Sequence, residues 1–184
     1  MTKVTKKAGT VLYPLPAVLV SCGIGDRANI ITLAWAGTLC SEPPLVGIGV
    51  RPGRHSHGLL KETGEFVVNL PREAQVRWTD YCGVVSGRDV DKWAACGFTR
   101  APGTEVKVPL IAECPANIEC RVQQTLSLGT HDLFIGEVVA VQMDEGVLDE
   151  QGRLDIAKAE PFAYLNGKYR RIGDVLGIHG YSKK

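Results

Sequence analysis

The residues best suited to bind a charged ligand gather in one short stretch, between positions 51 and 57. This stretch places Arg51, Arg54 and the hydroxyl of Ser56 at the start of a helix that we predict over residues 56–63, with Ser56 as its N-cap. Guanidinium groups form forked, charge-assisted hydrogen bonds with phosphate, and the free amides and the dipole of a helix N-terminus add to the attraction. Taken alone, the stretch indicates either a site for a phosphate monoester or a solvated basic turn.

A second stretch, over residues 23–28, resembles a nucleotide site. It matches the G-x-G-x-x-A fingerprint of dinucleotide-binding folds and follows an apolar segment, as that motif does. The fingerprint requires a helix directly after the glycines, but residues 29–33 read Asn-Ile-Ile-Thr-Leu and are rich in β-branched side chains. We therefore interpret residues 23–28 as a hairpin turn and keep a Rossmann-type site as the weaker alternative.

Short β-branched runs, separated by glycine and proline, dominate the elements that must position these residues. We predict six strands, at residues 17–22, 29–35, 45–50, 65–70, 117–123 and 133–143. Between the fourth and the fifth strand we predict one helix from Pro71 to about Gly83 and another over 89–96, with Asp89 at its start and Gly97 after its end. Six strands with a helical insertion predict a closed barrel, because closure removes exposed strand edges.

Composition and charge exclude several classes of protein. The 184 residues, 45% hydrophobic and 22% charged, suit one compact domain, and the net charge of +1 gives no general attraction for nucleic acid or an anionic membrane. No apolar run approaches the roughly 20 residues of a spanning helix and no export signal is visible, so we expect a cytoplasmic protein without membrane contact. The six cysteines stand singly, which argues against zinc and favours small apolar fillers.

Six segments follow one another in an order that carries a family resemblance. They are Pro-Leu-Pro-Ala-Val-Leu-Val at 14–20, Asn-Ile-Ile-Thr-Leu-Ala-Trp-Ala-Gly at 29–37, the prolines, strand and basic stretch at 43–57, Phe-Val-Val-Asn-Leu-Pro at 66–71, Ser-Gly-Arg-Asp-Val-Asp-Lys-Trp at 86–93, and Gly-Thr-His-Asp-Leu-Phe-Ile-Gly-Glu-Val at 129–138. Together they resemble the flavin reductase-like FMN-binding split-barrel family, especially its flavoredoxin-type members. The match runs over nearly the whole chain.

The resemblance implies a mainly β fold, a six-stranded antiparallel Greek-key split barrel with short helices. It implies a single domain over residues 1–184, with a core of about 10–165 and a C-terminal tail of 166–184. It also implies a homodimer with FMN in a groove near the subunit interface. The residues that it implies as FMN contacts are Thr32, Leu33, Ala34, Trp35, Arg51, Arg54, Ser56, Ser86, Gly87 and Lys92.

The resemblance also assigns parts of the cofactor to these residues. Residues 32–35 would line the edge of the isoalloxazine ring, largely through backbone groups, and we expect the ring of Trp35 to belong to the core. Arg54 and Ser56 would hold the phosphate. Ser86, Gly87 and Lys92 would close over the ring or the ribityl chain. Lys92 is a candidate cation for the negative charge of reduced flavin, or else an exposed helix charge.

The implied activity is that of an NAD(P)H-dependent flavin reductase, which passes electrons from bound FMN to a flavin, a metal complex or a protein acceptor. A non-enzymatic FMN electron carrier, reduced by a partner protein, is the alternative. His131 is the candidate catalytic residue, because the resemblance places it where it would orient the carboxamide of NADH or NADPH; as a lone histidine it would be a turn residue. The neighbouring Asp132 could accept its hydrogen bond and favour one tautomer.

The C-terminal segment allows two interpretations. Residues 162–173 predict a final strand and turn, and the glycine-rich residues that follow are typical of a flexible terminus. The alternative is that Tyr169 and its neighbours pack against the flavin of the other subunit.

Overall fold

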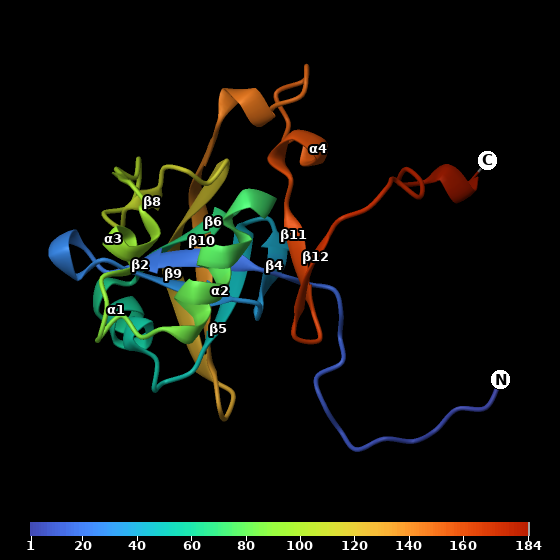
Figure 1. Ribbon diagram of the computed structural model, residues 1–184, viewed down its shortest axis with the longest axis horizontal. Helices are drawn as coiled ribbons and strands as arrows, with labels where there is room; N and C mark the ends of the chain where they lie inside the picture. The colour runs from blue at the N-terminus through green and yellow to red at the C-terminus, as the bar shows by residue number, and fades with distance from the viewer. Residues whose placement is uncertain (184) are drawn as a thin grey trace.

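The protein is built around one curled antiparallel sheet, seen in a computed structural model that describes residues 1–183 (Figure 1). The seven strands of this sheet are β2 (Val18–Cys22), β3 (Asn29–Leu33), β4 (Ala36–Ser41), β5 (Pro44–Val50), β6 (Glu65–Leu70), β9 (Ala116–Ser127) and β10 (Asp132–Met143). Their order across the sheet is β3-β2-β6-β9-β10-β5-β4. The mainly β split-barrel fold is therefore confirmed, but the sheet is a half-barrel with β3 and β4 at its edges and not the closed barrel that we predicted from the strand edges.

Smaller elements surround the sheet. The helices are α1 (His55–Thr63), α2 (Val76–Val84), α3 (Lys92–Cys96) and α4 (Ile156–Ala159), with 3-10 turns at Gly25–Arg27, Glu73–Gln75, Glu145–Val147 and Tyr181–Lys183. The remaining strands are β1 (Leu15–Pro16), β7 (Arg100–Ala101), β8 (Leu110–Ile111), β11 (Phe162–Leu165) and β12 (Lys168–Arg171). β1, β11 and β12 form a separate small sheet, which lies beside β4 in Figure 1. None of the helices within residues 1–183 is long and apolar enough to cross a membrane.

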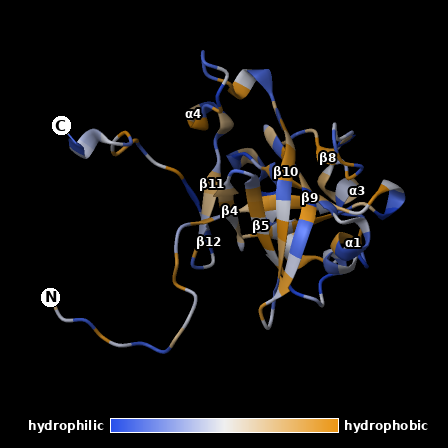
Figure 2. Cartoon of the chain, turned by 180° about the vertical axis from the view of Figure 1, so that it is seen from behind, coloured by the Kyte–Doolittle hydropathy of each residue, from blue (hydrophilic) through white to orange (hydrophobic). Residues whose placement is uncertain are grey.

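The period-2 alternation of β2 and β3 divides their side chains between two cores. Val20 and Ile31 face the inside of the curled sheet, where they join a buried cluster with Phe66 and Phe134. Leu19 and Ile30 face the other way and pack with residues of α2 and α3. Unlike β2 and β3, whose residues are nearly all buried, β9 carries both hydrophobic and hydrophilic residues, as Figure 2 shows. Because both faces of β3 are covered, its end is held firmly at the place where the candidate site begins.

The long hairpin of β9 and β10 gives the sheet its curl. Its register shifts twice, between Ile135 and Gly136 and between Val138 and Ala140. A Cβ on Gly136 would lie 2.6 Å from the ring of Phe66, so the backbone of β10 approaches the core as only glycine permits. Such bulges bend a strand and increase its twist. The predicted antiparallel pairing of these two strands is confirmed.

The six strands predicted from the sequence are all present, but a seventh was missed. β4 is an edge strand with mostly exposed residues, Ala-Gly-Thr-Leu-Cys-Ser, and so lacks the apolar alternation that reveals the others. The interpretation of residues 23–28 as a hairpin turn is confirmed, because β3 follows directly and pairs with β2. Residues 162–173 contain two paired strands, β11 and β12, where the sequence predicted one.

The three helices predicted from the sequence are present, but each begins at a different residue from the one predicted. Ser56 is not the N-cap of α1, because Arg54 occupies that position and the Ser56 side chain is buried. Pro71 lies outside α2, which begins after a 3-10 turn. α3 starts at Lys92 rather than near Asp89, because the carboxylate of Asp91 accepts from the amides of its first turn. The predicted role of Gly97 is confirmed by its left-handed C-cap, φ 67°.

The cysteines support the interpretation as apolar fillers. Five of the six are buried and Cys40 is half-buried, and all six are free thiols. Burial raises the pKa of Cys22, Cys114 and Cys120 to about 12, so these thiols stay protonated at neutral pH.

Candidate functional site

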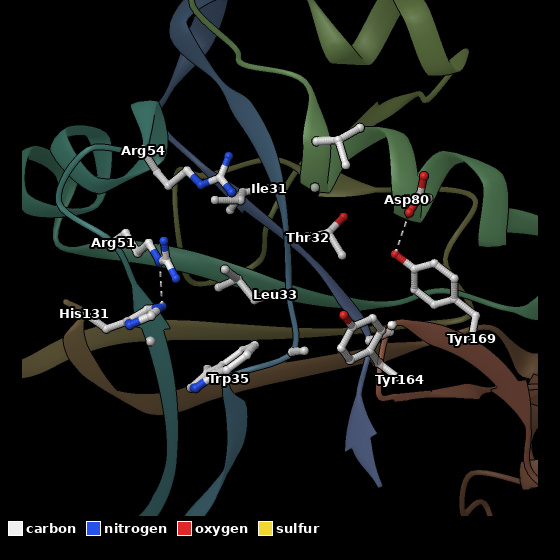
Figure 3. A pocket seen from close by; sticks show the side chains of 16 residues that line it. Ile31, Thr32, Leu33, Trp35, Arg51, Arg54, Asp80, His131, Tyr164 and Tyr169 are labelled. Atoms are coloured by element: carbon white, nitrogen blue, oxygen red, sulfur yellow. Dashed lines mark hydrogen bonds between the residues drawn. The ribbon is translucent and has the colours of Figure 1, made fainter. Parts of the chain in front are cut away.

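The end of β3 opens into a cavity of about 410 Å³, which we call the large cavity (Figure 3). Its floor is formed by residues 31–35, and two groups of side chains form walls on either side. One wall contains Arg51, Trp35 and His131, and the other contains Asp80, Tyr164 and Tyr169. The size lies within the range of small-molecule sites in proteins.

The first wall is a stack of charged and aromatic groups. The rings of Trp35 and His131 lie parallel, with centroids 5.7 Å apart and 10° between their planes. Arg51 Nε donates to His131 Nε2 over 3.4 Å, and Thr130 Oγ1 lies 3.0 Å from His131 Nδ1. Because a guanidinium only donates, Nε2 must accept, so the proton resides on Nδ1 and is donated to Thr130. Burial, with a smaller contribution from the charge of Arg51, lowers the pKa of His131 and keeps its ring neutral.

The second wall comes from the C-terminal hairpin and α2. Tyr169, on β12, donates its hydroxyl proton to Asp80 Oδ1 over 3.1 Å. Burial, together with this carboxylate, raises the pKa of Tyr169, so the phenol remains protonated. Tyr164 packs edge-on against Tyr169, with ring centroids 5.7 Å apart. The hairpin therefore contributes a polar aromatic wall to the cavity of its own chain.

A second, narrower space of about 160 Å³ adjoins the large cavity, and we call it the small cavity. Ile31 and Arg54 line both spaces and so mark where they meet. The other polar residues that line the small cavity are Asn29, His55, Ser56, Ser86, Arg88 and Lys92. Carboxylates are absent from this lining among the residues that the structure describes, so the space is strongly basic.

Lys92 is the most unusual residue of the small cavity. Its side chain is only 3% exposed, and Nζ donates to the carbonyl oxygens of Ile30 and Cys82, each over 2.8 Å. It forms no ion pair with any carboxylate of residues 1–183. Desolvation by burial lowers its pKa, and the neighbouring charge of Arg54 adds a minor part. Since an ammonium has three protons, one remains available to an anion in the cavity.

Ser56 and Asn29 are held together at the bottom of the small cavity. Both are buried, and Asn29 Nδ2 donates to Ser56 Oγ over 2.8 Å. This bond uses an acceptor position of the serine, so the hydroxyl can still donate its own proton to a ligand. Gly87 lies directly against Asn29, because a Cβ on it would be 2.2 Å from Asn29 Oδ1. The glycine is therefore required for the loop to approach so closely.

The structure brings all eleven predicted site residues to these two adjoining cavities. The large cavity is lined by Thr32, Leu33, Ala34, Trp35, Arg51 and His131, the small cavity by Ser56, Ser86, Gly87 and Lys92, and both by Arg54. The small cavity therefore places Ser86, Gly87 and Lys92 beside Arg54 and Ser56, the residues predicted to bind the phosphate. They do not line the large cavity with residues 32–35, which were predicted to contact the isoalloxazine ring. The roles assigned to the eleven residues stay predictions.

Three details of the sequence interpretation were wrong. Asp132 does not accept from His131, because its carboxylate instead binds His57 Nε2 over 2.8 Å and accepts from Ser127 over 2.8 Å. Lys92 is not an exposed helix charge. Trp35 is not a core residue, because it is 47% exposed and its ring, as well as its backbone, reaches the cavity.

Several site residues were not predicted. Asn29 and Arg88 lay inside segments quoted for the family resemblance, but nothing in their spacing indicated a role. Asp80 and Tyr164 come from elements far apart in the chain, and only the folded hairpin brings them to one wall. A buried polar residue at a strand start, such as Asn29, is the one signal that could have pointed to the site.

A family model described as "Flavin reductase like domain" matches residues 10–173, and the chain belongs to this family. It is similar to flavoredoxin of Desulfovibrio vulgaris (Miyazaki F), with 34% identity, a TM-score of 0.92 and 100% of both chains covered. It is equally similar to flavoredoxin from Methanosarcina acetivorans, with 35% identity, a TM-score of 0.92 and coverage of 100% and 98%.

A third similar structure is an FMN-binding protein from Thermus thermophilus with bound 1-cyclohex-2-enone. It shares 31% identity with this chain, with a TM-score of 0.79 and coverage of 93% and 96%. These likenesses support a flavin as the cofactor. The donors of the small cavity fit the phosphate of such a group, because a buried ammonium that pairs with no carboxylate of residues 1–183 lies there beside the Ser56 hydroxyl and Arg54.

Proposed function

We propose that this chain binds one FMN per subunit and acts as an NAD(P)H-dependent, flavin reductase-like oxidoreductase that passes electrons to a flavin, a metal complex or a protein acceptor. The observation that carries the proposal is the buried ammonium of Lys92, which pairs with no carboxylate of residues 1–183, at a basic cavity next to a larger cavity. A buried cation whose partners are two neutral carbonyl oxygens is unfavourable compared with one that faces an anion. It becomes favourable when an anion such as the phosphate of FMN occupies the small cavity.

In this proposal, each cavity has a separate task. Arg54, Ser56 and Lys92 donate hydrogen bonds to the phosphate, and the amides at the start of α1 add favourable potential. The segment 32–35 positions the ring in the large cavity. FMN, when bound, supplies one-electron and two-electron redox chemistry, so the chain needs no acid–base apparatus of its own.

The charged wall of the large cavity would tune and orient the reactants. Arg51 is a cation of this cavity, so it takes the role that the sequence suggested for Lys92, favouring negative charge on the reduced cofactor. His131 is neutral, and its Nε2 accepts only a long bond of 3.4 Å from Arg51. A carboxamide N–H of NADH or NADPH can replace that weak donor. His131 would then orient the nucleotide without transferring a proton.

The decisive experiment is anaerobic reduction of the FMN-loaded protein, followed by its visible absorption. NADH or NADPH, added separately, should bleach the flavin bands. Isothermal titration calorimetry should show that Arg54→Ala weakens FMN binding sharply, whereas Arg77→Ala, an exposed arginine of α2, should not. A protein that takes up no FMN would overturn the proposal.

An FMN electron carrier reduced by a partner protein is the second candidate. The names of the two flavoredoxins, each about a third identical to this chain, favour it. If dithionite bleaches the bound flavin but neither nucleotide does, the carrier is correct and the reductase is excluded.

We further propose a homodimer that works in the cytoplasm, where both nucleotides are available. Apolar side chains are exposed on the body of the protein, at Trp35, Leu39 and Val141, and on the two terminal segments, at Leu12 and Leu176. In Figure 1 both terminal segments run away from the body. Exposed apolar surface of this kind favours burial against a second subunit. Light scattering during gel filtration should give twice the mass of the 19.9 kDa chain.

A further inference from the structure

Three residues of the cavity linings each have a buried neighbour in the chain. The pairs are Arg51 with Val50, Ser56 with His57, and His131 with Asp132. Val50 lies opposite Asp132 in the pairing of β5 with β10, and His57 Nε2 lies 2.8 Å from Asp132 Oδ2. The three buried neighbours therefore meet in space, and the contacts that hold them also hold the backbone of both cavity linings.

The carboxylate of Asp132 uses both of its oxygens inside the fold. His57 Nε2 donates to Oδ2 and Ser127 Oγ donates to Oδ1, each over 2.8 Å. The bond from His57, and after it the bond from Ser127, lowers the pKa of Asp132, so this side chain is an ionised acceptor. The side chains of His57 and Asp132 are only 10% and 12% exposed, so water competes little for the bond between them.

His57 connects this bond to the basic stretch that lines the small cavity. Its ring packs edge-on against the buried ring of Phe134, with centroids 5.4 Å apart. The amide of His57 donates to the carbonyl of Arg54 over 3.1 Å, and the amide of Arg54 donates to the carbonyl of Arg51 over 3.0 Å. Residues 51–57 are thus a series of closed turns with one side chain fixed in the core. A shift of His57 would move the donors of this segment.

Asp132 connects the same bond to the large cavity through its backbone. It is the first residue of β10 and is buried, whereas the side chain of the preceding His131 lines the large cavity. The His131 ring itself is held by a long bond of 3.4 Å from Arg51 and by its parallel contact with Trp35, which is half exposed. Because such contacts adjust easily, the position of this ring depends on the anchored residue beside it.

We infer that Asp132 and His57 are positioning residues for both cavities, because the buried bond between them holds the donors of the small cavity and His131 in one fixed arrangement. The inference deepens the proposed function and rests on it for the identity of the ligands. Neither residue lines either cavity. Donors and orienting groups act well only when supporting bonds keep them close to the productive geometry. This bond therefore contributes to FMN affinity and to the position of the His131 ring.

The test breaks the bond and then restores it. His57→Leu removes the donor, whereas His57→Gln supplies an amide N–H in place of Nε2. FMN affinity, measured by isothermal titration calorimetry on the full chain, should fall about threefold to tenfold in His57→Leu and stay within about twofold of the wild type in His57→Gln. Asp132→Ala should resemble His57→Leu, because it removes the acceptor of the same bond.

A second measurement follows the large cavity in the ligand-free protein. The imidazole C–H signals of His131, recorded by NMR, depend on how its ring lies over the ring of Trp35. His57→Leu should shift these signals, although His57 is far from His131 in the chain, and His57→Gln should restore them. A loss of stability alone would not shift the signals of the folded protein.

Glu119→Gln is the matched control, because Glu119 is another buried carboxylate and lines neither cavity. It accepts from the amides of Thr104, Glu105 and Val106. This variant should lower the melting temperature without changing the FMN affinity or the His131 signals.

The possible outcomes separate this inference from the proposed function. A wild type that takes up no FMN overturns the proposed function, and the NMR comparison of the ligand-free proteins then decides the inference. Unchanged His131 signals in His57→Leu overturn the inference, as does an equal loss of FMN affinity in His57→Leu and His57→Gln. If His57→Leu fails to fold in a thermal unfolding control, Asp132→Ala takes its place in both measurements.

Discussion

The small and large cavities adjoin but are built differently. The small cavity is defined by buried groups that are fixed by hydrogen bonds, such as the Ser56–Asn29 pair and the ammonium of Lys92. The large cavity is lined by more exposed aromatic and charged side chains, including Trp35 at 47% exposure and the weakly bonded pair of Arg51 and His131. Fixed donors suit a ligand that stays bound, whereas exposed and adjustable groups suit one that comes and goes.

This difference assigns separate measurable quantities to the two regions. Changes in the small cavity should alter the affinity for FMN, because its donors are preorganised for the phosphate. Changes in the large cavity should alter how a second reactant binds or reacts. The following variants test whether the two regions can be separated in this way.

The largest effect is expected for Lys92→Met. The variant loses a charge-assisted hydrogen bond to the phosphate, so FMN affinity should fall about 10- to 100-fold. The free energy of unfolding of the ligand-free chain should fall by less than the free energy of FMN binding. The reason is that burial already lowers the pKa of this ammonium and makes its charge unfavourable without an anion. Calorimetric titration with FMN and urea unfolding measure the two quantities.

Lys61→Met is the matched control for this variant, since Lys61 is an exposed lysine of α1. It should leave both quantities nearly unchanged. Equal FMN affinity in wild type and Lys92→Met would contradict the assignment of the small cavity to the phosphate.

A smaller and different effect is expected for His131→Ala. In anaerobic stopped-flow reduction, the nucleotide concentration that gives half the maximal rate should rise roughly threefold to tenfold, because an orienting hydrogen bond is lost. FMN affinity should change much less than in Lys92→Met. His179→Ala, an exposed histidine of the C-terminal segment, is the control. If His131→Ala instead weakens FMN binding as strongly as Lys92→Met, the two cavities do not act separately.

The sequence predicts the small cavity better than its exact contacts. Arg54 and Ser56 stand in one local motif at a helix start, so their proximity follows from the chain itself. The burial of Lys92 does not, because its long side chain reaches between β3 and α2 and depends on the packing of both elements. The sequence likewise does not show whether the Asp132 carboxylate bonds to His131 or to His57. The bond to His57 depends on the packing of α1 against the sheet.

The same limit explains the strand and the wall that were missed. The six predicted strands carry an apolar face that must be buried, and this requirement is visible as alternation. β4 is held by pairing with β5 rather than by burial of its own residues, so its sequence lacks the signal. Tyr164 and Asp80 meet only through the C-terminal hairpin, a contact between distant segments that local patterns do not encode.

The smallest expected effect concerns the charge of His131 in the ligand-free protein. Burial first, and the charge of Arg51 second, lower the pKa of His131 below its ordinary value of 6.5. Arg51→Ala removes the second cause, so the NMR titration midpoint of the imidazole C–H signals should move toward 6.5 without reaching it. Between the folded pKa and 6.5 the unfolded chain binds more protons, so this histidine makes the fold less stable as the pH falls through that window. A wild-type midpoint at or above 6.5 would mean that the large cavity holds a charged imidazolium, and the neutral, orienting role of His131 would then be wrong.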